Sequence, residues 1–212
     1  MKLSTLDELF LYELKDVYDA EHQLVEALPK LARAATDADL ATAFETHLTE
    51  TRKQVTRLRE VFAECDETPD RVECKGMKGL IAEAEQVMKE DAEPAVMDAA
   101  LIAAAQRVEH YEIAAYGTLI TWAQSGGFRG AQHLLEQNLE EEKAADEKLT
   151  EIAESVVNPD AASTENEESE EGEMVGAASG ARGQASRRGS NGGRTAGNRR
   201  GSRHRSGSGR GR

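Results

Sequence analysis

The sequence has few cysteines and no long apolar run, and each shortage excludes a class of protein. Its two cysteines, Cys65 and Cys74, are spaced C-x8-C and lack partner ligands, which indicates reduced thiols rather than a disulfide framework or a zinc site. A run of about 18 apolar residues is absent, so no membrane-spanning helix is expected. The first residues, MKLSTLDELFLYELK, carry acids where a signal peptide needs an unbroken apolar stretch, which predicts a cytoplasmic protein.

Positive charge is scarce over most of the chain. Residues 1–158 contain 33 acids against 16 lysines and arginines, and only nine of these are lysines. Residues 159–212 contain 7 acids against 10 arginines. An acidic, lysine-poor composition is typical of soluble proteins in salt-loving cells, with an ordinary acidic surface as the alternative. The change near Asn158 divides the chain into a predicted folded domain, residues 1–158, and a tail, residues 159–212.

The hydrophobic pattern predicts helices, because no stretch alternates with the period of a strand. Thr5 and Glu8 fit a capping box at the start of the first helix. The four long helical segments cover about residues 5–35, 36–63, 94–126 and 129–157. The connector between the second and third contains the helical stretch GLIAEAEQVMKE. Two tight hairpins joined by a long crossover predict an all-α, ferritin-like four-helix bundle with a helical crossover between helices 2 and 3.

The helical pattern disappears after Asn158. Residues 159–173 form an acidic, serine-rich spacer, and residues 174–212 form an arm of glycine, serine and arginine. Such segments cannot bury enough apolar surface to offset their ordering entropy, so we predict that the tail is disordered. The arginines of residues 182–212 favour weak, salt-dependent contact with nucleic-acid phosphates, and the absence of aromatic residues predicts little base preference. A solubilising tail, or one that folds back on the acidic bundle, is the alternative.

Acidic residues interrupt the apolar seams of three helices. The interruptions and their polar neighbours are, in chain order, Glu21, His47, Glu50, Glu109, Glu112, Glu142 and Asp146. Counted from the turns near Thr36 and Gly126, Glu21 falls level with Glu50, and Glu112 with Glu142, in two antiparallel hairpins. If the hairpins pack with those heights aligned, the side chains converge in the bundle interior.

Carboxylates buried together need compensation. Moving one unpaired carboxylate into a core costs several kcal/mol, so the acids must either take up protons or bind cations. Carboxylates with an imidazole form an oxygen-rich set that suits iron or manganese, which predicts a site for two such ions. For any single acid the alternative is a position at the rim, or a hydrogen bond to a buried tyrosine: Tyr12, Tyr18, Tyr111 or Tyr116.

Four segments, YDAEHQLVEALPKLA, AFETHLTETRKQVTRL, VEHYEIAAYGTL and NLEEEKAADEKL, carry a family resemblance. Over about residues 3–157 the chain resembles the ferritin-like stress proteins of the YciE/YciF type. The resemblance implies a rubrerythrin-like bundle, commonly a homodimer, with a carboxylate-bridged dinuclear metal centre. Glu21 matches the single glutamate of the first helix in the broader di-iron pattern, and Glu109 with Glu112 matches the paired acids of the third.

Two helices depart from that di-iron pattern. The second carries His47-x-x-Glu50, with Lys53 three residues later, where Glu-x-x-His is usual. On the fourth helix Glu142 fits, but Asp146 stands nearest to the position of the expected histidine. Because imidazoles are fewer, the metal identity stays open between iron and manganese.

Two functions are consistent with these features. The preferred hypothesis is a stress protein that reduces peroxide or oxidises Fe²⁺ at two iron or manganese ions. Its ligands would be bridges from Glu112 and Glu142, terminal ligands from Glu21 and Glu50, and Glu109 or His47 to complete the shell. The alternative is a non-catalytic, dimeric stress or assembly protein, whose acids bind no metal or a static one and whose basic tail contacts nucleic acid.

Overall fold

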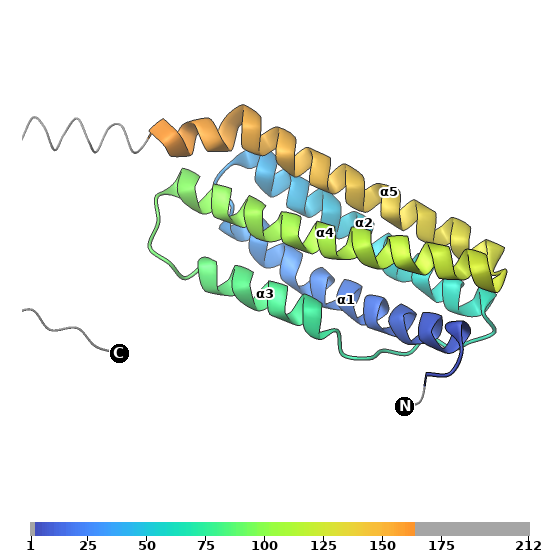
Figure 1. The fold of residues 1–212 in the computed structure, drawn as a ribbon. Helices are drawn as coiled ribbons and strands as arrows, with labels where there is room; N and C mark the ends of the chain where they lie inside the picture. Colours follow the sequence, from blue (N-terminus) through green and yellow to red (C-terminus); the bar gives the residue numbers. More distant parts are fainter. Residues whose placement is uncertain (1–2, 164–212) are drawn as a thin grey trace, which may run out of the picture. The chain divides into compact units, whose positions relative to one another are not determined.

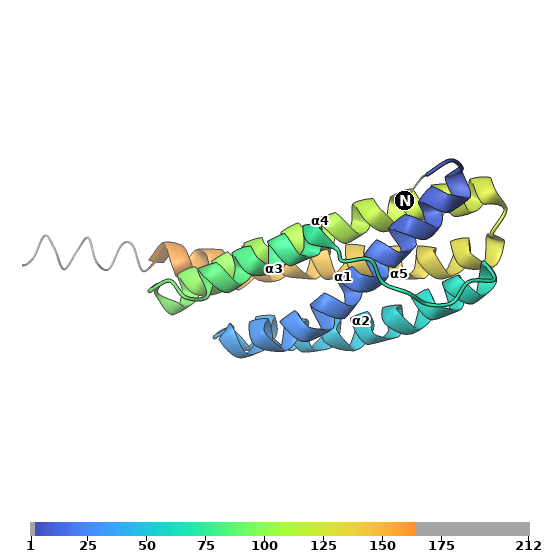
Figure 2. The ribbon, with the colours of Figure 1, turned by 90° about the horizontal axis from the view of Figure 1, so that it is seen from below.

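The computed structural model describes residues 3–163, and every regular element within this range is helical. The α-helices are α1 (Leu6–Ala34), α2 (Ala38–Glu64), α3 (Lys75–Val87), α4 (Pro94–Gly126) and α5 (Arg129–Ile152). The four long helices lie side by side as a bundle, and α3 runs along α1 and α4 within the long connection (Figures 1 and 2). This arrangement confirms the predicted all-α bundle with a helical crossover between its second and third long helices.

The helix ends follow from local chemistry. Glu8 N–H donates to Thr5 Oγ1 at 3.1 Å while Thr5 N–H donates to Glu8 Oε2 at 3.2 Å, so the predicted capping box is present. Helix α4 stops where Gly127 takes a φ of 79°, a left-handed conformation that strains residues with a Cβ. The two-residue connection that follows makes α4 and α5 an antiparallel hairpin.

Helix α3 begins four residues before the stretch that the sequence indicated. Cys74 caps it, because its Sγ accepts from Met77 N–H at 3.4 Å. The backbone N–H of Cys74 donates to Asp19 Oδ2 on α1 at 2.9 Å, and this hydrogen bond joins the start of α3 to the bundle. Cysteine is not among the preferred capping residues, so this start lacks the usual sequence signal.

The C-terminal end of α5 continues further than predicted. A π-helical turn, Ala153–Val157, follows α5, and residues 158–163 are helical, so helix extends five residues past the expected domain end at Asn158. Pro159, which has no N–H to donate, comes directly after Asn158, the residue that caps this π turn. The rest of the predicted tail, residues 164–212 with the arginine-rich arm 182–212, lies outside the described residues.

The apolar core of the bundle falls into two clusters. The first cluster includes Leu24, Phe44, Leu101, Val108 and Leu149. The second cluster includes Leu14, Val17, Val55, Leu119 and Leu135. On each long helix the predicted polar residues fall between members of the two clusters, so a polar layer separates two apolar halves of the core.

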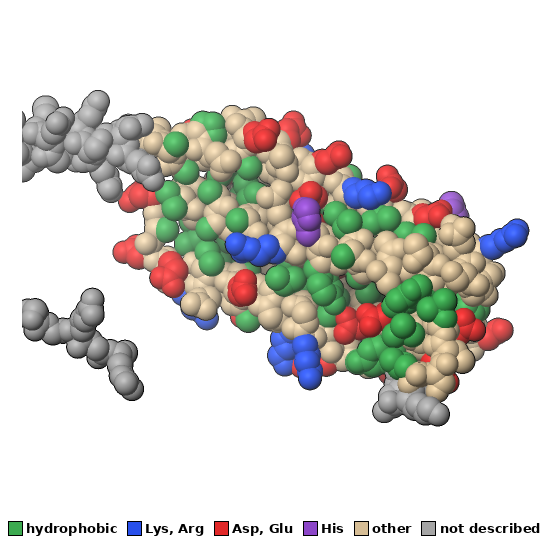
Figure 3. All heavy atoms as spheres, viewed as in Figure 1, with side chains coloured by type: hydrophobic (Ala, Val, Ile, Leu, Met, Phe, Trp, Pro, Cys, Tyr) green, Lys and Arg blue, Asp and Glu red, His purple; other side chains and the backbone are tan. Residues whose placement is uncertain are grey.

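No helix within residues 3–163 is both long enough and apolar enough to cross a membrane. Asp and Glu side chains are spread over the face shown in Figure 3, with Lys and Arg side chains between them. Carboxylates on that surface are solvated and need no special explanation. The acids of the polar layer are different, because they lie inside the bundle.

Candidate metal centre

Each long helix contributes to the polar layer. Glu21 comes from α1, His47 from α2, Glu109 and Glu112 from α4, and Glu142 from α5. Three of the glutamates are 0% exposed, Glu109 is 2% exposed and His47 is 5% exposed. The apolar seams before and after each of these residues are buried, so the helices hold their side chains towards the bundle axis.

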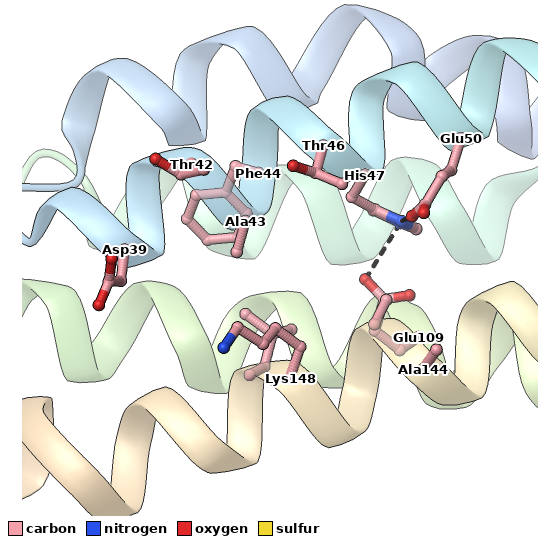
Figure 4. Close-up of a pocket in the computed structure, with 12 residues that line it drawn as sticks. Asp39, Thr42, Ala43, Phe44, Thr46, His47, Glu50, Glu109, Ala144 and Lys148 are labelled. Carbon is pink, nitrogen blue, oxygen red and sulfur yellow. Dashed lines mark ion pairs between the residues drawn. The ribbon is translucent and has the colours of Figure 1, made fainter.

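Four of these side chains lie close enough together to hold a metal ion. One potential ligand atom from each of His47, Glu109, Glu112 and Glu142 lies within 4.8 Å of the other three. His47 Nε2 is 3.3 Å from Glu109 Oε1 and 3.7 Å from Glu142 Oε2. Figure 4 shows His47 and Glu109 facing each other across the gap between α2 and α4.

Glu21 and Glu50 border this group of four. Glu21 Oε1 accepts a short hydrogen bond from the Tyr116 hydroxyl. For this one oxygen, a buried tyrosine is the partner, as the alternative to a metal ion anticipated. The other oxygen of Glu21 has no hydrogen-bond partner. Glu50 Oε2 lies 3.8 Å from His47 Nδ1, and its side chain is 32% exposed. Glu50 therefore stands at the edge of the layer.

Asp146 is not brought into the group. Its Oδ2 lies 3.3 Å from His110 Nε2, and its Oδ1 accepts from Gln106 Nε2 at 3.2 Å. Four residues after Glu142, the helix has risen about 6 Å and turned about 40° further. That displacement directs Asp146 to the side of α4 on which His110 is exposed.

The hydrogen-bond inventory singles out the same layer. Within residues 3–163, every buried side-chain nitrogen or oxygen without a hydrogen-bond partner belongs to it or borders it. These atoms are Glu21 Oε2, His47 Nδ1 and Nε2, Gln54 Oε1, Glu109 Oε2, Glu112 Oε1 and Oε2, and Glu142 Oε2. Native proteins pair nearly all buried polar atoms, so this concentration points to a ligand.

The titration behaviour has a clear cause. Burial raises the pKa of Glu21 to about 8 and that of Glu142 to about 7. Burial also raises the pKa values of Glu109 and Glu112 well above the usual range. Burial lowers the pKa of His47, but the charges of Glu109 and Glu142 outweigh it and raise that pKa to about 10. Without a cation the layer holds protons, and a bound cation would displace them.

Gln54 supports the layer and was missed as a site residue in the sequence. It is 0% exposed, and its Nε2 donates a short hydrogen bond to Glu142 Oε1. Gln54 lies seven residues after His47, two helical turns along the same face, and this spacing is the signal that could have identified it.

A chain of hydrogen bonds holds Glu21 in place. Arg57 Nη1 donates to Asn138 Oδ1 at 2.7 Å, and Asn138 Nδ2 donates to the Tyr116 hydroxyl at 3.0 Å. Tyr116 in turn donates to Glu21. Every donor in the chain points towards Glu21, so the chain fixes the carboxylate and favours its charged form.

Comparisons with known proteins agree with the fold. The chain matches the family described as "Domain of unknown function (DUF892)" over residues 5–162. Protein YciF of Escherichia coli strain K12 is 49% identical over 159 residues, which cover 74% of this chain and 96% of that protein.

Two solved structures are also similar. That of the E. coli stress protein YciF has a TM-score of 0.71 and 48% identity, and the match covers 74% of this chain and 99% of that one. The structure of YcfI, a putative structural protein from Rhodopseudomonas palustris, has a TM-score of 0.69 and 46% identity. This match covers 70% of this chain and 95% of that one. These matches confirm the resemblance to the YciE/YciF type. The chain therefore belongs to the DUF892 family.

Proposed function

We propose that the polar layer holds two divalent iron or manganese ions. One observation carries this proposal: the orphaned buried polar atoms of residues 3–163 gather in this layer. A buried polar group without a partner costs about 1–3 kcal/mol, and a charged one costs more. Cations between the carboxylates would give these atoms partners.

The ligand roles follow from which oxygens are free. Glu112 has two unpaired oxygens, and Glu109 and Glu142 have one each. We assign Glu112 and Glu142, both in the group of four, as the ligands that two ions would share. Glu21 and Glu50 at the margins would be terminal ligands, and His47 with Glu109 would complete the shell. We leave Asp146 out, because both its oxygens face partners outside the group.

The donor set favours iron or manganese. Carboxylate oxygens suit hard divalent cations, and one imidazole among them is compatible with iron. Four carboxylates are almost fully buried, so two divalent ions would balance the charge of the ionised layer and one would balance only half of it. This argument supports a dinuclear site over a mononuclear one.

The activity that fits such a site is peroxide reduction or Fe²⁺ oxidation. When bound, two ferrous or manganous ions would supply the two electrons that, with two protons, reduce hydrogen peroxide to two water molecules. The protein's part is to position the ligands: Gln54 holds Glu142, Tyr116 holds Glu21, and the two apolar clusters pack on either side of the layer. The E. coli relative is described as a stress protein, which agrees with this role.

Elemental analysis tests the proposal directly. Protein purified without chelator is expected to hold two iron or manganese ions per chain and to consume peroxide. A Glu112→Ala/Glu142→Ala variant is expected to lose both ions together, because it removes both bridges. Asp146→Ala is the matched control on α5 and is expected to keep both.

A different result would favour the alternative function. A fully folded wild type that binds no iron or manganese, even after both are added, would support a non-catalytic stress or assembly protein. Two bound ions in a protein that consumes neither peroxide nor Fe²⁺ would support a static metal site.

A further inference from the structure

A pocket of about 380 Å³ opens beside the polar layer, between α2 and α5. Its inner end is formed by Glu50 with the buried His47 and Glu109 (Figure 4). A molecule that enters from solvent therefore meets two residues of the candidate metal centre at the bottom of the pocket.

The walls of the pocket are mainly apolar. Phe44 and Leu149 are buried there, and Ala43 and Ala145 are half-buried. Charged side chains stand at the inner end and at the mouth, where Asp39 and Lys148 are exposed. Largely apolar walls with a few polar groups are typical of a site for a ligand with an apolar body and one reactive group.

The pocket is larger than hydrogen peroxide requires. Hydrogen peroxide is about the size of two water molecules, each of which occupies roughly 30 Å³ in the liquid. The pocket volume of about 380 Å³ exceeds that several times. Pockets of roughly 300–1,000 Å³ accommodate organic molecules of considerable size.

The charges around the pocket disfavour an anion. Asp39, Glu50 and Glu109 face it with two groups that can carry positive charge, Lys148 and His47. His47 is already paired, because its ring nitrogens lie 3.8 Å from Glu50 Oε2 and 3.3 Å from Glu109 Oε1. The Lys148 ammonium is already paired, because Nζ lies 2.9 Å from Glu151 Oε2. A substrate that carries its own carboxylate, such as a fatty-acid hydroperoxide, would find both cationic groups already paired with acids.

We propose that this pocket binds an uncharged organic hydroperoxide. Its apolar group packs against Phe44 and Leu149, and its peroxide group lies at the inner end beside His47 and Glu109. The inference rests on the proposed peroxide reduction and names its substrate class. Reduction breaks the O–O bond and, with the two electrons of that reaction and two protons, releases the alcohol and one water.

Binding is tested on the metal-free, full-length protein. The probe is 2-phenyl-2-propanol, the alcohol formed from cumene hydroperoxide, with affinity measured by ligand-observed NMR. Ala144 is exposed and lines the pocket, so Ala144→Trp is expected to fill it and weaken binding at least about tenfold. Ala103→Trp, at an exposed position on α4 outside the pocket, is the matched control and is expected to bind as the wild type does.

Two binding results would overturn the inference. One is the absence of binding to the wild type, and the other is equal binding to Ala144→Trp. Decanoate, an anion of similar size, is expected to bind more weakly than the alcohol, and tighter binding of decanoate would contradict the charge argument.

Turnover separates this inference from the proposed function. In protein loaded with Fe²⁺, Ala144→Trp is expected to lower the second-order rate constant of single-turnover oxidation by cumene hydroperoxide about tenfold. The rate constant for hydrogen peroxide, a much smaller molecule, is expected to fall less. Consumption of hydrogen peroxide but not of cumene hydroperoxide would overturn the substrate class and leave the metal centre standing. Consumption of neither would overturn the proposed function, whereas NMR alone decides whether the pocket takes the alcohol.

Discussion

Asp98 and Glu112 are both buried carboxylates on α4, yet their surroundings are opposite. Asp98 is 2% exposed and accepts three hydrogen bonds: Thr36 N–H at 2.8 Å, Thr36 Oγ1–H at 2.5 Å and Asp37 N–H at 2.8 Å. Glu112 is 0% exposed, and neither of its oxygens has a hydrogen-bond partner. Burial alone therefore does not identify a ligand-binding acid, whereas the lack of partners does.

The difference follows from position along the bundle. Asp98 lies beside the turn between α1 and α2, where the amides that precede α2 are free to donate. Glu112 lies in the middle of α4, where neighbouring backbone amides are already bonded within helices. Asp98 is satisfied by the protein itself and joins the α1–α2 turn to α4. Glu112 needs a proton or a cation from outside.

The largest effect expected from a single substitution on the free energy of unfolding tests the Asp98 side of this comparison. Asp98→Ala leaves three donors without an acceptor, so metal-free protein is expected to lose about 3 kcal/mol in urea unfolding. Glu112→Gln breaks no hydrogen bond and is expected to leave stability unchanged or higher. Asp91→Ala, at an exposed position, is the control and is expected to change stability by less than about 0.5 kcal/mol. Equal losses in the Asp98 and Asp91 variants would remove the contrast.

The pH dependence of metal-free protein tests the Glu112 side. Burial raises the folded-state pKa of Glu142 to about 7 and that of Glu21 to about 8, so the folded state keeps protons that the unfolded chain releases above about pH 4.5. Stability is therefore expected to fall as pH rises from about 4.5 to about 8, by up to about 1.4 kcal/mol per pH unit for each such group. Loss of the His47 proton, at a pKa of about 10, extends the fall.

Thermal unfolding between pH 5 and 9, with a chelator and with added Mn²⁺, measures this trend. The fall is expected to be shallower in Glu142→Gln, which removes one of the titrating groups. Added Mn²⁺ is expected to stabilise the protein more at higher pH, because cations bind the deprotonated acids. A metal-free protein whose stability rises over this range would contradict the assignment of protonated buried acids.

The smallest expected effect on stability concerns Glu21, the one acid of the layer that is partly satisfied by a hydrogen bond. Tyr116→Phe removes the donor to Glu21 Oε1 and is expected to cost about 1 kcal/mol of stability. It is also expected to weaken metal binding about tenfold, measured by titration with Mn²⁺, because Glu21 loses its orientation. Tyr18→Phe is the matched control, since the Tyr18 hydroxyl accepts from Arg59 at 2.9 Å and does not touch the layer. Equal metal affinity in both variants would mean that Tyr116 acts only through packing.

Sequence periodicity predicted the long helices well, because each has a continuous apolar seam with recognisable ends. It was less successful where an end depends on a distant residue. The start of α3 relies on Cys74 and on Asp19 of α1, and helical residues 158–163 follow a π turn ahead of Pro159. Local sequence carries little information about such contacts.

For the candidate site, the same seams led to Glu21, Glu109, Glu112 and Glu142, all of which are buried, but they did not tell which buried acids are satisfied. Asp98 lies three residues before Leu101 and interrupts a seam just as Glu112 does. Asp146 was placed with the site, yet its partners Gln106 and His110 on α4 draw it outwards. Gln54 was not included, although it contacts Glu142. The apolar periodicity of one helix contains no information about the side chains of the facing helix, and those side chains supply the hydrogen bonds.

The sequence by itself determined that this chain folds into helices whose buried faces contain acids at matching heights, since helical spacing and turn positions are local properties. Only the tertiary structure decided that His47, Glu109, Glu112 and Glu142 converge to within 4.8 Å, that Asp98 is satisfied by a turn, and that a pocket opens onto the layer. The physical reason is that the rotation and register of packed helices set side-chain distances, and both arise from contacts between helices.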